Sequence, residues 1–250
     1  MDLTAIDSSN WSSWMQLLMS LVGVATIFAI AVIGSANRKA INLRTIAIAF
    51  ALQTAIAAFV LYVPAGGRIL DKVVRGVQFV INQGKHGIEF VFGPQIESSL
   101  GFTIAFGVLP VIVFFAALMS VLYYLGIMQR VVGTFGGWLH KLLGTSHAES
   151  VSAVSNIFVG HTDAPLVVRP YLKNMTQSEL FAVMTGGCAT IAGAVMMGYA
   201  QMGVELKYLI TASFMAAPGG LMMAKILMPE TEPHDEVPKA EEIDEEEQPV

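Results

Sequence analysis

The residues best suited to chemistry lie in one short polar stretch, Asn156-Ile-Phe-Val-Gly-His161-Thr-Asp163-Ala-Pro165, within an otherwise apolar region. A charged residue at lipid depth costs about 2.5–3.5 kcal/mol on insertion scales. Non-helical backbone is tolerated there only where it is buried in protein or lines a wet cavity. We therefore predict a re-entrant helical hairpin over residues 148–173, whose tip contacts a solute.

Several groups in this stretch could bind a polar solute or a cation. Thr162 and Asp163 stand just before Pro165, which fits the first turn of a helix, so they could cap its free N–H groups. His161 and Asp163 offer different donors and acceptors, and the partly positive end of a helix favours a polar solute. Asn156 adds a side-chain oxygen, a ligand type that hard cations such as sodium prefer.

These residues also have structural interpretations. Asp163 could be only a helix cap, His161 a hydrogen-bonded buried side chain, and Asn156 a contact between helices. A hydrolase is not indicated, because Ser152 and Ser155 are outside any Gly-x-Ser-x-Gly turn. A metal site is not indicated, since the histidines lack a spacing such as His-Glu-x-x-His. We expect a membrane protein that is not an enzyme.

The composition supports this class. Hydrophobic residues make up 54% of the chain, charged residues 13%, and the mean hydropathy is +0.63. The net charge of −5 is misleading, because ten of the nineteen acidic residues lie between Glu230 and Val250. Nucleic acid binding is not indicated, since no basic patch alternates with aromatic residues. Cys188, the single cysteine, excludes an intramolecular disulfide.

Long uncharged runs predict membrane-spanning helices, and charged amphipathic segments separate them. Arg38, Lys39 and Arg44 place the first loop in the cytoplasm and the N-terminus outside. Arg68–Gly93 and Arg130–Ser146 mix charges with apolar residues and predict interfacial helices. We predict an all-α integral membrane fold with about five spans, at Trp14–Ile33, Thr45–Val63, Phe102–Met128, Leu180–Val204 and Tyr208–Leu227.

We expect three regions along the chain. Residues 1–100 hold the N-terminal spans and the first interfacial helix. Residues 101–228 hold the hairpin and a discontinuous helix at 178–204, where several glycines permit local unwinding. Residues 229–250 are rich in Glu and Pro and predict a disordered acidic tail.

Two motifs resemble one family. Gly160-His-Thr-Asp-Ala-Pro-Leu-Val-Val-Arg-Pro-Tyr171 is similar to the first re-entrant hairpin of the concentrative nucleoside transporters, usually written Gly-Gln-Thr/Ser-Glu-Ala-Pro. Glu179-Leu-Phe-Ala-Val-Met-Thr-Gly-Gly-Cys-Ala-Thr-Ile-Ala-Gly193 is similar to the discontinuous helix that follows it. The resemblance extends to about Pro229.

The resemblance implies symport of nucleosides with sodium or protons, by a homotrimer in the bacterial inner membrane. It implies base contacts from His161, Thr162 and Asp163 at the hairpin tip and from Val195 on the following helix. It also implies sodium ligands from the hairpin and the unwound helix, at Asn156, Val159, Thr190 and Ile191, with Val159 and Ile191 acting through backbone carbonyls. No cofactor beyond the coupling ion is implied.

The chain departs from the family pattern in three ways. His161 replaces the usual Gln and Asp163 the usual Glu, which changes the donors, the reach and the titration of the tip. The second half of the family fold is absent from this sequence, so it could be a separate chain or a continuation of a fragment. We expect that the chain does not transport alone, and the alternative is a non-transporting membrane scaffold or gating subunit.

Overall fold

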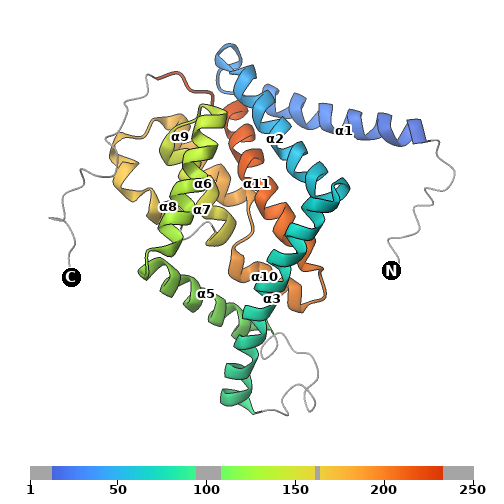
Figure 1. The fold of residues 1–250 in the computed structure, drawn as a ribbon. Helices are drawn as coiled ribbons and strands as arrows, with labels where there is room; N and C mark the ends of the chain where they lie inside the picture. Colours follow the sequence, from blue (N-terminus) through green and yellow to red (C-terminus); the bar gives the residue numbers. More distant parts are fainter. Residues whose placement is uncertain (1–12, 94–107, 161–163, 233–250) are drawn as a thin grey trace.

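A computed structural model describes residues 13–93, 108–160 and 164–232, and within these ranges the regular elements are all helices (Figure 1). This confirms the predicted all-α class. The helices are α1 Ser13–Ile33, η2 Arg38–Ala40, α2 Leu43–Tyr62, α3 Pro64–Phe92, α5 Leu109–Tyr124, α6 Ile127–Leu143, α7 His147–Phe158, α8 Ala164–Val167, η4 Arg169–Asn174, α9 Gln177–Ala189, α10 Gly193–Gln201 and α11 Leu206–Leu227, of which η2 and η4 are 3₁₀ helices.

Several of these helices have the length and composition of membrane spans. By those criteria the described residues contain three, at Leu43–Val60, Gln177–Gln201 and Leu206–Leu227, and the bent pair α5–α6 makes a fourth if it counts as one span. Helix α1 carries a shorter apolar stretch, Leu18–Ile33, and extends away from the bundle (Figure 1). The chain is therefore built as a multi-pass membrane protein.

The amphipathic segment predicted at Arg68–Gly93 is a single helix, α3. Pro64 starts it, because proline fits the first helical position, and Gly93 ends it. Ile81 is buried, and Leu70, Val74 and Val77 pack on the same cluster. Their spacing of three to four residues places them on one face, which leaves the charged residues on the other.

The span predicted at Phe102–Met128 needs a correction. The helical run α5 ends at Tyr124, and α6 begins at Ile127 with its axis turned by 80°. Gly126 causes the turn, because its φ of 74° is left-handed and interrupts the helix. Most of the segment predicted as interfacial at Arg130–Ser146 lies in α6, and the buried face of α6 packs against α7.

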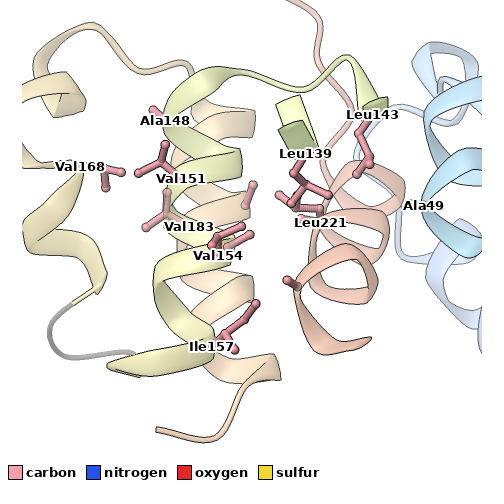
Figure 2. Packing of buried hydrophobic residues seen from close by; sticks show 14 of the residues in the cluster. Ala49, Leu139, Leu143, Ala148, Val151, Val154, Ile157, Val168, Val183 and Leu221 are labelled. Carbon is pink, nitrogen blue, oxygen red and sulfur yellow. The ribbon is translucent and has the colours of Figure 1, made fainter. Parts of the chain in front are cut away.

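The core forms around α7, which lies between α6, α9 and α11 (Figure 2). Each of the ten residues from Ala148 to Ile157 is buried, so this short helix is enclosed on all sides. Figure 2 shows Val151 and Val154 of α7 packed among side chains from the surrounding segments. Burying one such side chain contributes about 1.5–3 kcal/mol, so packing fixes the position of α7.

Candidate functional site

The first half of the predicted hairpin, α7, begins at a capping box and ends at a glycine. The Ser146 hydroxyl accepts the N–H of Glu149 at 3.2 Å, and the Glu149 carboxylate accepts the N–H of Ser146 at 2.9 Å. Gly160 follows the helix with a φ of 82°, a conformation that glycine adopts readily. The chain becomes helical again at Ala164, and Pro165 lies in the first turn of α8. The helix–break–helix order agrees with the sequence pattern.

The predicted discontinuous helix is broken between α9 and α10. Helix α9 begins at a second capping box, formed by Thr176 and Glu179. Thr190, which follows α9, is extended at φ −114° and ψ 158°, and α10 begins only at Gly193. The carbonyls of Thr190 and Ile191 therefore lie outside both helices, where they are free of the i to i+4 ladder.

The two breaks lie against each other. A Cβ atom on Gly160 would lie 2.4 Å from the Cβ of Ala192, and one on Gly193 would lie 2.4 Å from the carbonyl oxygen of Phe158. Separations this short exclude any side chain at either glycine unless the backbone moves. The end of α7 and the start of α10 thus make direct backbone contact, as a site shared by hairpin and broken helix requires.

Asn156 lies one turn before the hairpin break and is fully buried. Its Nδ2 donates to the carbonyl of Ser152 at 3.1 Å, whereas Oδ1 accepts no hydrogen bond from any residue that the structure describes. A Cβ on Gly186 would lie 3.4 Å from Asn156 Nδ2, so the amide faces α9. The carbonyl of Gly186 accepts the hydroxyl of Thr190 at 3.0 Å, which holds the Thr190 side chain against the last turn of α9.

This arrangement suits a hard cation. A buried acceptor without a donor costs about 1–3 kcal/mol, and a cation would remove that cost. Asn156 Oδ1 and the Thr190 hydroxyl are oxygen ligands, and the break adds backbone carbonyls that lie outside both helices. Of the four predicted cation ligands, the structure relates Asn156 and Thr190 through Gly186, and it places Val159 and Ile191 in the two breaks.

Of the four residues predicted to contact the solute, the structure describes only Val195. His161, Thr162 and Asp163 lie outside the described residues, so their contact with a nucleobase stays a prediction. Val195 lies on the first turns of α10 with 42% of its surface exposed. A cavity of about 600 Å³ lies beside the hairpin break, lined in part by Val159 and Ala194. This cavity is large enough for a small solute.

Two polar contacts in this region had not been expected from the sequence. The hydroxyls of Tyr123 on α5 and Ser155 on α7 lie 3.1 Å apart. Glu149 forms a buried ion pair with Lys225 near the end of α11. Two signals in the sequence pointed to the ion pair between Glu149 and Lys225. One is the pattern Ser/Thr-x-x-Glu at the start of each half-helix, and the other is a lone lysine in a predicted apolar span.

Comparison with known proteins gives two family matches. Residues 22–95 match the family described as "Na+ dependent nucleoside transporter N-terminus", and residues 105–205 match the family described as "Nucleoside recognition". The solved structure of CNTnw in an inward-facing substrate-bound state is 55% identical, with a TM-score of 0.85 over 89% of this chain and 55% of that one. These matches confirm the resemblance carried by the two motifs.

Curated relatives give the same result. The nucleoside permease NupC of Helicobacter pylori is 52% identical over 221 residues, which are 86% of this chain and 53% of the permease. The sodium/nucleoside cotransporter 1 of Rattus norvegicus is 39% identical over 217 residues, 87% of this chain and 33% of the cotransporter. The chain spans about half the length of the bacterial relatives that it matches.

Proposed function

Because this chain belongs to the concentrative nucleoside transporter family and corresponds to its N-terminal part, we propose that it serves nucleoside uptake coupled to a cation gradient. The observation that carries this proposal is the buried Oδ1 of Asn156, an acceptor without a donor among the described residues, one turn before the contact between two helix breaks. A cation held at this point would bind both the hairpin and the broken helix, and so would link them.

The coupling ion in this proposal is sodium. Its ligands are the side-chain oxygens of Asn156 and Thr190 and the backbone carbonyls of Val159 and Ile191. The oxygen-only character of this set supports a hard cation, because no titratable side chain is needed to complete it. The rat relative is named a sodium/nucleoside cotransporter, which supports sodium over a proton.

The nucleoside in this proposal lies beside the breaks. Its base contacts His161, Thr162 and Asp163 at the hairpin tip and Val195 on α10. The contact of Gly160 with Ala192 supports this assignment, because it holds the last described residue before the tip against the broken helix. The proposed protein is a homotrimer in the bacterial inner membrane, in which residues 101–228 form half of the transport core and the second half of the family fold completes the pathway.

Uptake measurements test the proposal. Labelled uridine and adenosine are offered to vesicles with and without an inward sodium gradient, using the chain alone and the chain extended by any coding sequence that continues it. Gradient-driven uptake by the extended form supports the proposal. An absence of uptake in both forms, with inserted and folded protein, would favour a scaffold or gating subunit. Asp163→Ala separates these two functions further, because a transporter would lose solute binding with its assembly intact.

A pair of threonine variants tests the cation site. Thr190→Val and Thr211→Val each remove a hydroxyl that donates to the carbonyl four residues earlier, at 3.0 Å and 2.7 Å. Thr190 lies at the break, whereas Thr211 is an ordinary position on α11. We expect Thr190→Val alone to raise the half-saturating sodium concentration. Equal sodium dependence in the two variants would exclude Thr190 as a ligand.

A further inference from the structure

Lys225, near the end of α11, is a buried cation that the proposed transport site does not use. Its side chain is 10% exposed. The ammonium group contacts the carboxylate of Glu149, the hydroxyl of Ser178 at 2.9 Å and the carboxylate of Glu230 at 3.3 Å. An ammonium has three N–H donors, so these three contacts satisfy the group completely.

Two of the three partners of Lys225 belong to the first turns of the two half-helices that lead to the breaks. Glu149 is the capping-box residue of α7, and Ser178 lies in the first turn of α9. Glu230 reinforces the second link, because its carboxylate also accepts the hydroxyl of Thr176, the N-cap of α9, at 2.9 Å. Lys225 therefore ties the beginnings of α7 and α9 to each other and to α11.

The two half-helices have nearly the same length. Helix α7 has 12 residues and α9 has 13, so each is about 18–20 Å long at a rise of about 1.5 Å per residue. The first turns of both helices contact Lys225. The residues that follow each helix meet at the contact between the two breaks. Two packed helices of nearly equal length whose N-terminal ends are held together have little freedom to slide past each other at their C-terminal ends.

We propose that Lys225 is a positioning residue, which sets the register of α7 against α9 and thereby the separation of Asn156 and Thr190 at the far ends. This inference rests on the proposed function, since it makes the affinity for the coupling cation depend on a contact one half-helix away. Stability alone does not explain the cluster, because buried ion pairs are on average no more stabilising than apolar residues of the same volume.

Four variants test this role. Lys225→Met removes the charge at similar length, and Lys225→Arg keeps it; a cavity of about 460 Å³ beside Lys225 leaves room for the larger group. Glu149→Gln combined with Lys225→Met removes the ion pair without leaving the buried Glu149 carboxylate unpaired. Lys207→Met is the matched control, since Lys207 lies on the same helix in an exposed ion pair with Glu205 at 2.7 Å.

The measurements, made with the extended form of the chain, are the half-saturating sodium concentration for uridine uptake and the uridine KM at saturating sodium. We expect Lys225→Met and the double variant to raise the half-saturating sodium concentration about 10-fold, which is about 1.4 kcal/mol of binding free energy. The uridine KM should be nearly unchanged. Lys225→Arg should restore most of the affinity, and Lys207→Met should behave as wild type. A lower maximal rate with unchanged sodium affinity in both variants would overturn the proposal.

Hydrogen exchange separates this inference from the proposed function. If the wild-type chain shows no uptake even when it is extended by the coding sequence that continues it, the proposed function fails, but the effect of Lys225 on the two breaks can still be measured. Lys225→Met and the double variant should speed amide exchange at residues 158–160 and 190–193 more than Lys207→Met does. Unchanged exchange at both breaks in the folded double variant would refute the positioning role.

Discussion

Alanine at Gly160 should separate the two breaks, and the cost can be worked out from the structure. Gly160 combines a φ of 82° with a potential Cβ position 2.4 Å from Cβ and 2.9 Å from Cα of Ala192. A left-handed non-glycine residue costs about 1–2 kcal/mol, and overpacking a close contact costs about 1–3 kcal/mol more. We therefore expect Gly160→Ala to lower the free energy of unfolding by about 2–5 kcal/mol.

Two other glycines divide this cost into its parts. Gly126 has a similar φ of 74°, but a Cβ there would meet nothing within 4 Å, so Gly126→Ala should cost only about 1–2 kcal/mol. Gly193 has no left-handed φ, but its Cβ would lie 2.4 Å from the carbonyl oxygen of Phe158. Gly193→Ala should therefore cost about 1–3 kcal/mol, through the close approach alone.

Two assays are needed: unfolding of the purified protein in detergent, and a sodium titration of uridine uptake into vesicles that hold the extended form of the chain. Gly160→Ala and Gly193→Ala should both raise the half-saturating sodium concentration, because both push the breaks apart. Gly126→Ala should leave that concentration unchanged while it lowers stability. The reasoning is refuted if Gly160→Ala costs no more than Gly126→Ala, or if Gly193→Ala leaves the sodium dependence as in wild type.

Two further predictions concern polar contacts around α7. Partial desolvation and, after it, the charge of the neighbouring His140 lower the pKa of His147 below its usual 6.5, so its neutral form is favoured in the folded protein. The effect on stability should be small, because the residue is still exposed at the surface. Its contribution to stability is therefore present above about pH 6.5 and is lost as the pH falls through the folded pKa, and His147→Gln should make unfolding less acid-sensitive. Tyr123→Phe and Ser155→Ala should each cost about 1 kcal/mol, and the double variant little more than either, because both remove the same contact; additive costs in denaturant unfolding would show that the hydroxyls act independently.

The sequence predicted the helix–break–helix order around Gly160 and the break after α9 because their signals are local. A polar Gly-to-Pro stretch inside an apolar region has few structural solutions. The structure agrees with the predicted one, since α7 ends before the left-handed Gly160 and α8 begins at Ala164. The amphipathic pattern of α3 is equally local, since an apolar face repeats every three to four residues. Such patterns require no knowledge of what lies opposite them in space.

The bend at Gly126 could not be predicted in the same way. Gly126, Gly133 and Gly137 occur close together in the chain, but only Gly126 adopts a left-handed φ, while the other two lie inside α6. Glycine permits a turn without requiring one, so the neighbouring helices decide where the chain bends. The contact between Gly160 and Ala192 and the ion pair between Lys225 and Glu149 also join distant segments, which a single sequence does not pair.

The two ends of α7 and α9 differ in how their polar groups are satisfied. At their N-termini, reciprocal capping boxes and Lys225 provide partners for carboxylates and N–H groups that would be costly to bury alone. Near their C-terminal ends, a left-handed Gly160 follows α7, an extended Thr190 follows α9, and Asn156 Oδ1 finds no donor among the residues that the structure describes. Asn156 Oδ1 thus leaves an unmet acceptor one turn before the contact between the hairpin break and the broken helix, and a cation bound there would stabilise both segments.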